Sequence, residues 1–189
     1  MTARADAAQA TADRIVDAAI DVFWERPSHE MSLEQVARRA GVTKQTVLRR
    51  FGSKAGLFAA AAERSMDRAR VGRDDVEPGD LPGAVAALVT HYEQLGDGVL
   101  RMLAEEERNP GLREVVDQGR AYHVSWCRRV FRPTLSGLRG AGRNRRLAQL
   151  VAVCDVYTWK LLRRDRGLSR PQTETALLEL LQPLTGDSR

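Results

Sequence analysis

The sequence predicts an all-α fold, in which an N-terminal three-helix unit of the helix-turn-helix type precedes a larger helical domain, with about nine helices in total. Apolar residues recur with the helical period, two capping boxes mark helix starts, and no segment alternates apolar and polar residues as a half-buried strand does. With 189 residues, the chain can form one sizeable domain or two small domains that share an interface.

Composition predicts a cytoplasmic protein. Hydrophobic residues make up 43% and charged residues 29% of the chain, which suits a soluble protein with a substantial core. Because no apolar run approaches the ~20 residues that cross a bilayer, and the N-terminus lacks a signal-peptide pattern, we expect no membrane association. The two cysteines, Cys127 and Cys154, are too few for a disulfide scaffold. The net charge of +5 favours an anionic partner only weakly.

Apolar stripes and caps define the first helices. One stripe over residues 15–23 predicts a first helix that Arg26 and Pro27 end, because the residue before a proline avoids the helical region. Ser32 and Gln35 then form a capping box, in which each side chain can bond to the backbone of the other residue. This box predicts the start of a second, short helix.

A tight turn separates the second predicted helix from the third. Gly41 ends the second helix because glycine accepts a positive φ, and Thr43 caps the third. Two short helices joined in this way over residues 32–54 match the helix-turn-helix pattern, whose second helix lies in a DNA major groove about 12 Å wide. The side chains expected to face base edges are Thr43, Lys44, Gln45, Thr46, Leu48 and Arg49.

The charge pattern around this segment favours contact with DNA phosphates. No acidic residue lies between Glu34 and Glu63. The residues expected to hold phosphates, which fix register without reading sequence, are Ser32, Arg38, Arg39, Arg50 and Lys54.

A second acid-free window lies between Asp117 and Asp155 and is rich in arginine. We interpret it as the surface of a long helix and its loop, although an acidic ligand or a second nucleic-acid contact would also fit.

A polar stretch at 71–80 indicates the boundary between two parts of the chain. We therefore expect a DNA-binding domain at 1–52, a linking helix at about 53–71 and a helical domain at 72–189. The later helices are expected at about 81–95, 99–108, 112–138 with an interruption at Pro133, 143–165, and from a second capping box at Ser169 and Gln172 to about Pro183.

Several N-terminal segments share a known pattern, namely Val42–Phe51, Ser53–Lys54, Leu57–Phe58, Ile15–Ala19 and Met31–Ala37. Together they resemble the TetR (tetracycline-repressor-like) family of transcription regulators, and this resemblance is specific over roughly residues 10–62. Beyond that region, the chain is similar to the family in length, in helical rhythm and in the segment Trp159–Leu162.

This resemblance implies a homodimer joined through the last two helices, a palindromic DNA operator, a small-molecule effector bound by the larger domain, and repression. Lys54 matches the family's phosphate-binding lysine. Leu48 stands where the family usually has a tyrosine that contacts the DNA backbone, so one polar contact is lost. The residues that match the family's base-facing positions are Thr43, Gln45, Thr46 and Arg49.

Aromatic and soft side chains of the larger domain are candidates for an effector site, although ordinary core packing explains them as well. Tyr122 and Trp126, four residues apart, share one helical face. His123 and Cys127 share another face, but no third metal ligand follows at a suitable spacing, so we expect neither a metal nor a cofactor. The candidate pocket residues are His91, Tyr92, Met102, Tyr122, Trp126 and Tyr157.

Two other classes of function remain open at this point. One is a helical enzyme or metal-binding protein that uses residues 32–54 only as scaffold, but no phosphate loop or catalytic triad spacing indicates it, so we expect no catalytic residue. The other is an interaction module whose basic helix binds an acidic partner. Salt-dependent binding to duplex DNA with a sequence preference would separate the first interpretation from both.

Overall fold

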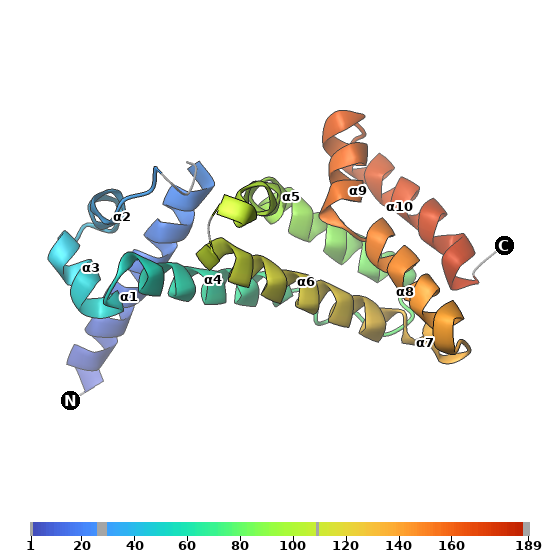
Figure 1. The fold of residues 1–189 in the computed structure, drawn as a ribbon, viewed down its shortest axis with the longest axis horizontal. Helices are drawn as coiled ribbons and strands as arrows, with labels where there is room; N and C mark the ends of the chain where they lie inside the picture. Colours follow the sequence, from blue (N-terminus) through green and yellow to red (C-terminus); the bar gives the residue numbers. More distant parts are fainter. Residues whose placement is uncertain (1, 26–29, 109, 187–189) are drawn as a thin grey trace. The chain divides into compact units, whose positions relative to one another are not determined.

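The computed structural model describes residues 2–25, 30–108 and 110–186, and within these ranges it is all-helical (Figure 1), which confirms the predicted fold class. The end of the first helix predicted at Arg26 and Pro27 lies outside the described residues. The described ranges hold ten α-helices together with a 3-10 helix, η1, and a π-helix, η2. Their bounds are α1 (Thr2–Glu25), α2 (Leu33–Ala40), α3 (Lys44–Phe51), α4 (Lys54–Arg70), α5 (Leu81–Glu105), η1 (Glu106–Arg108), α6 (Pro110–Val130), α7 (Arg132–Ser136), α8 (Gly140–Val153), α9 (Val156–Lys160), η2 (Leu161–Asp165) and α10 (Arg170–Thr185).

The chain forms two compact units. The first unit contains Met1–Arg68 and Glu105–Val115, and the second contains Ala69–Ala104 and Val116–Arg189. α4 therefore begins in the first unit and ends in the second. The domain division that the sequence predicts, with its linking helix, stays a prediction.

The first unit buries one face of each of its first helices. α1 packs against α2, and α2 packs against α3. Four side chains with no exposed surface supply the centre of this packing: Ile15 of α1, Val36 of α2, Val47 of α3 and Leu57 of α4. The short helices α2 and α3 are therefore held by burial of their apolar sides rather than by their own length.

Ion pairs join α4 to α1 near the surface. Arg64 pairs with Asp13, and its Nη1 atom lies 3.1 Å from Oδ1 of Asp17. Nη2 of Arg68 lies 2.7 Å from the same oxygen. The hydrogen bond from Arg64 lowers the pKa of Asp13. Because water screens such exposed pairs, they orient the two helices more than they stabilise the fold.

A close contact with Trp159 explains why a glycine stands at position 96 inside α5. The sequence predicts two helices here, at about 81–95 and 99–108, and this prediction is wrong because α5 continues from Leu81 to Glu105. Trp159 has no exposed surface, and a Cβ atom added at Gly96 would lie 2.5 Å from its Cζ3 atom. The glycine is needed for packing against the indole and does not form a turn.

The single helix expected at about 143–165 is also divided in the structure. α8 ends at Val153, and α9 begins after Asp155, whose carboxylate accepts a hydrogen bond from the Tyr157 backbone N–H at 2.9 Å. Asp155 is therefore the N-cap of α9, and the residues after it do not continue the helical turn of α8.

Two other sequence signals are confirmed. α6 ends at Val130, and Pro133 lies in the first turn of α7, where the missing N–H of proline costs no helical hydrogen bond. At the start of α10, the Gln172 backbone N–H donates to the Ser169 hydroxyl at 3.4 Å, and Ser169 N–H donates to the Gln172 side chain at 2.9 Å. This is the second capping box.

Candidate nucleic-acid interface

α2 begins at the capping box that the sequence predicts. The Ser32 hydroxyl accepts a hydrogen bond from the Gln35 backbone N–H at 3.2 Å, and Gln35 Oε1 accepts one from the Ser32 N–H at 2.8 Å. Both bonds satisfy backbone donors that a helix start leaves open. The buried side of the helix consists of Leu33, Val36, Ala37 and Ala40.

The turn between α2 and α3 depends on Gly41. Its φ of 67° lies in the left-handed region, which glycine adopts without steric cost. The Val42 N–H donates to the Ala37 carbonyl at 2.9 Å, and the Thr43 hydroxyl accepts from the Thr46 N–H at 3.2 Å to start α3. The predicted helix stop and the predicted cap are both confirmed.

α3 is anchored on one side and exposed on the other. Val47 has no exposed surface, whereas Lys44, Gln45 and Arg49 are exposed. Gln45 and Arg49 lie one helical turn apart and therefore share a face. A face of this kind can present an amide and a guanidinium together to the edges of base pairs.

The other three residues predicted to face bases are hydrogen-bonded within the helix start or half-buried. The hydroxyls of Thr43 and Thr46 lie 3.0 Å apart and bond to each other, so both serve the helix start. Thr46 and Leu48 are half-buried. Their contact with bases stays a prediction.

Lys44 makes an ion pair that the sequence does not predict. Its Nζ atom lies 2.5 Å from Oε1 of Glu34 on α2, and the two side chains are 51% and 55% exposed. The hydrogen bond from Lys44 is the largest cause of the lowered pKa of Glu34. Because solvent-exposed ion pairs are weak, Lys44 can exchange this carboxylate for a phosphate or a guanine. In the sequence, Glu34 only marks where the acid-free window begins, and nothing there predicts its ion pair with Lys44.

The arginines expected to hold phosphates fall into two groups. Arg38 and Arg50 are exposed and form no ion pair with any residue inside the described ranges. Arg39 instead pairs with α1, where its guanidinium lies 2.5 Å from Glu25 and 3.8 Å from Asp21. In the free protein, Arg39 therefore joins α2 to α1, and a phosphate would have to compete with these carboxylates.

Lys54 also has an internal partner. Its Nζ atom donates to the Met31 carbonyl at 2.6 Å and lies 5.6 Å from the centre of the Phe58 ring. The Ser32 hydroxyl, likewise expected on a phosphate, is used by the capping box. Phosphate contacts by these two residues stay predictions.

In the second unit, the aromatic residues predicted to line a pocket differ in burial. Tyr157 is a correction, because it is 53% exposed on α9. Its prediction rested on its aromatic side chain alone. Tyr122 and Met102 are half-buried. The buried members are His91, Tyr92 and Trp126.

Arg73, which lies in the polar stretch taken as a domain boundary, is buried with only 3% of its surface exposed. Its guanidinium lies 4.3 Å from the centre of the Trp126 ring and 5.2 Å from that of Tyr122. Its Nη2 atom lies 3.1 Å from Nδ1 of His123. Because arginine can only donate, His123 accepts at Nδ1 and donates from Nε2 to the Val151 carbonyl at 3.2 Å.

Burial shifts the titration of the groups around Arg73. Burial, followed by the charges of Arg73 and His123, lowers the pKa of His91 to about 3. A hydrogen bond from Cys154, followed by one from His123, lowers the pKa of Cys127, whereas the same thiol contact raises that of Cys154. Burial in this unit therefore favours the neutral form of the His91 imidazole.

A cavity of about 250 Å³ lies elsewhere in the second unit, and it contains none of the predicted pocket residues. Among the described residues, no group of three or more potential metal ligands is suitably placed. None of the described helices has the length and apolar character needed to span a membrane. The cavity is lined by Gly79, Leu81, Val130, Phe131, Pro133, Thr134 and Thr185.

Comparisons with known proteins agree with this architecture. Residues 15–61 match the sequence model of the family described as bacterial regulatory proteins, tetR family. The HTH-type transcriptional regulator AlkX of Mycobacterium tuberculosis is 39% identical over 56 residues, which span 30% of this chain and 26% of that protein. The chain thus matches about a quarter of that relative's length.

Solved structures share the fold over most of the chain. A transcriptional regulator from Rhodococcus sp. Rha1 is 22% identical, with a TM-score of 0.71 over 93% of this chain and 96% of that one. The transcriptional regulator FadR from Bacillus subtilis, solved with stearoyl-CoA, is 18% identical, with a TM-score of 0.66 over 93% and 98% of the two chains.

Within the described ranges the chain is all-helical, and its N-terminal helix-turn-helix unit lies in the segment that matches this family. Residues 15–61 are therefore similar to the N-terminal domain of the tetR family of bacterial regulatory proteins.

Proposed function

We propose that the chain is a ligand-responsive repressor of transcription that binds a palindromic DNA operator as a homodimer. The observation that carries this proposal is the exposed face of α3, where Gln45 and Arg49 stand beside Lys44 on a helix anchored by Val47. Glutamine can form two hydrogen bonds to adenine, and arginine or lysine can reach guanine. A regulator that binds chromosomal DNA acts in the cytoplasm, as the composition predicts.

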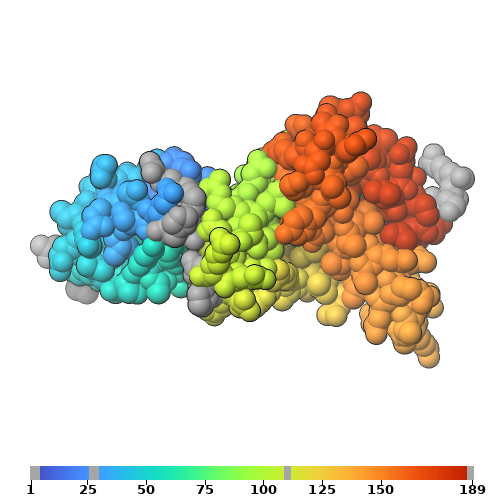
Figure 2. Space-filling view, turned by 45° about the horizontal axis from the view of Figure 1, so that its top comes forward, coloured from blue at the N-terminus to red at the C-terminus, as the bar shows by residue number. Residues whose placement is uncertain are grey.

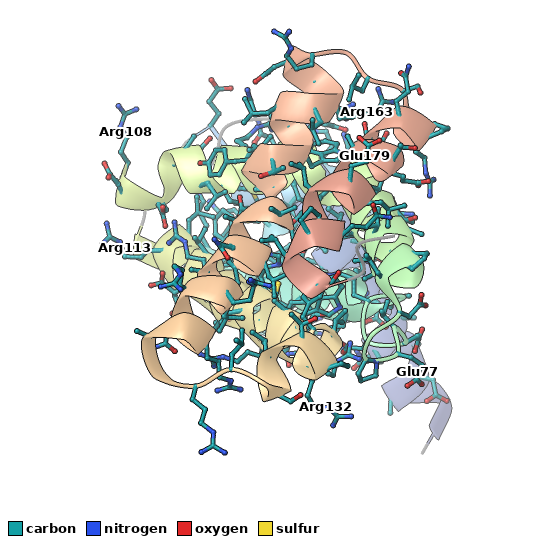
Figure 3. All side chains as sticks on the ribbon, turned by 90° about the vertical axis from the view of Figure 1, so that its right-hand side faces the viewer. Glu77, Arg108, Arg113, Arg132, Arg163 and Glu179 are labelled. Carbon is teal, nitrogen blue, oxygen red and sulfur yellow. The ribbon has the colours of Figure 1, made fainter. Side chains whose placement is uncertain are left out.

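Exposed apolar side chains on the last helices support a dimer. Tyr157 and Leu161 lie one turn apart and are 53% and 56% exposed, and Leu180 of α10 is 47% exposed. In Figure 2, the orange and red atoms of the last helices adjoin on the surface of the second unit, and Figure 3 views this side, with Arg163 and Glu179 labelled. Helix packing between two subunits would cover these side chains.

The effector would act by preferring one of two dimer geometries. Two recognition helices reach successive major grooves when they lie about 34 Å apart. An effector that binds more tightly to a dimer with another spacing releases DNA, by an amount set by its differential affinity. FadR, which shares the fold, was solved with stearoyl-CoA, and this supports a small-molecule effector for the present chain.

Selection of bound fragments from random duplex DNA by the purified chain tests this proposal. The expected product is a palindromic motif with half-sites about one helical turn apart, bound less tightly as salt rises. Absence of any enriched motif at low salt would refute DNA recognition. A motif without two-fold symmetry would support DNA recognition but contradict binding as a symmetric dimer. Binding to polyglutamate with the same affinity as to duplex DNA would instead indicate an interaction module.

A further inference from the structure

We propose that the second unit binds an organic monoanion of the carboxylate class, whose charged group pairs with the buried guanidinium of Arg73. This inference rests on the proposed function in one respect, because it takes the anion to be the effector. Binding of the anion itself can be measured without DNA.

The first reason is a buried guanidinium that has no carboxylate partner among the described residues. Within the described ranges, no carboxylate lies at ion-pair distance from Arg73; the adjacent Asp74 contacts Arg129 at 3.8 Å and the Tyr122 hydroxyl at 2.9 Å. Burying an unpaired charge is costly, and arginine does not lose its proton to avoid that cost. An anion would therefore complete this part of the unit.

The second reason is an unused hydrogen-bond donor. The Nε atom of Arg73 is buried and has no acceptor anywhere in the described part of the chain. Nη2 of the same guanidinium is used by His123, which shows that the group is oriented and not merely covered. A carboxylate oxygen is a strong acceptor for a guanidinium N–H and would satisfy Nε.

The charge count indicates a monoanion. Arg73 supplies one positive charge, and burial lowers the pKa of the nearby His91 to about 3, so this imidazole adds no charge at neutral pH. A phosphate monoester, with a charge of about −1.5 to −2, would bring more negative charge than this site neutralises. The rings of Tyr122 and Trp126 on the guanidinium favour an apolar body on the ligand.

The position of Arg73 connects this site to the DNA-binding unit through the chain itself. α4 begins in the first unit and ends at Arg70, three residues before Arg73. The Arg73 carbonyl accepts hydrogen bonds from Trp126 Nε1 and Arg129 Nη2, both at 2.8 Å. An anion at Arg73 would therefore act on the segment that directly continues α4.

Calorimetric titration of the full chain with matched probes tests the proposal. Octanoate and 4-phenylbutyrate are compared with octanamide and 4-phenylbutyramide, and with inorganic phosphate. We expect at least one carboxylate to bind about ten- to a hundredfold more tightly than its amide, because a hydrogen bond to a charged group is lost in the amide. Arg73→Met should reduce carboxylate binding to the level of the amide. The matched control Arg120→Met, which removes an exposed arginine from the same unit, should leave it unchanged.

Each result decides the proposal. Failure of both carboxylates to bind, equal binding of acid and amide, tighter binding of phosphate, or unchanged binding by Arg73→Met would overturn it. Should Arg73→Met fail to fold, Arg73→Lys keeps the charge without the planar fork, and unchanged affinity there would also overturn it. Loss of DNA binding by the wild-type chain would reject the proposed function alone, because the calorimetric result does not depend on DNA.

Discussion

We propose that Gln45 and Arg50 make two different kinds of DNA contact, which mutation can separate. Gln45→Ala should cost about 1–3 kcal/mol on the selected operator and little on random duplex DNA, because an amide pair reads a base. The comparison variant Arg50→Ala should weaken both alike, because a phosphate contact carries no sequence information. Both effects are measured by fluorescence anisotropy at fixed salt. An equal loss on random DNA after Gln45→Ala would exclude base recognition by this residue.

Among the residues that the structure describes, Glu34 is the one acid that forms an ion pair with a residue expected to face bases. Glu34→Gln should raise the affinity for duplex DNA about twofold or more, because it releases Lys44 and removes a negative charge near the phosphates. Glu63→Gln on α4, which removes an exposed acid at the far border of the window, should change affinity less. Competition binding at low salt measures the difference. Unchanged or weaker binding by Glu34→Gln would show that Lys44 stays with α2 and does not reach DNA.

At the scale of the elements, the packing of α5 against Trp159 leaves no room for a side chain at position 96. Gly96→Ala should destabilise the protein by about 1–3 kcal/mol, because the new Cβ would meet the indole at 2.5 Å. Gly119→Ala in α6 is the matched control, since a Cβ there meets nothing within 4 Å, and alanine should stabilise the helix by up to about 1 kcal/mol. Urea unfolding midpoints compare the two, and equal stability of both variants would contradict the packing argument.

Helix starts and stops could be predicted from the sequence where the signal is local. The box at Ser32 and the glycine at 41 involve residues within a few positions of each other, and the structure confirms them. Gly96 has the same residue type, but its partner Trp159 is far along the chain, so the expected break is absent. Asp155 caps α9 through a contact with Tyr157, two residues away, and such a local signal can also be recognised in a sequence.

For the whole molecule, His91 should make stability depend on pH. Its pKa is about 3 in the folded protein, against an ordinary value of 6.5, because burial disfavours the imidazolium. The unfolded chain therefore binds more protons below pH 6.5, and the free energy of unfolding should fall by up to about 1.4 kcal/mol per pH unit from there towards pH 3. Above pH 6.5 this contribution is fully present.

The measurement is urea unfolding between pH 7 and pH 5, where carboxylates contribute least. His91→Phe, which keeps a ring in the core but cannot bind a proton, should show a flatter dependence than the wild-type chain. The same slope for both would indicate that His91 is not the group that titrates.

The helix-turn-helix that carries the candidate DNA interface could be predicted from the sequence, because α3 and its caps lie in one short segment. The buried cluster could not, because Arg73 and His123 are 50 residues apart and meet only in the folded chain. A polar stretch that contains Arg73 is typical of a linker, and nothing local in it indicates that two aromatic rings from α6 cover the guanidinium.

The bond between Lys54 and the Met31 carbonyl has a further consequence for motion. It joins residues 23 positions apart at 2.6 Å, and the enclosed stretch contains α2, the glycine turn and α3. A stretch closed at both ends opens cooperatively rather than by fraying from one end. The amide hydrogens of α2 and α3 should therefore exchange with deuterium as a single group, and a bound duplex should slow that exchange for both helices together.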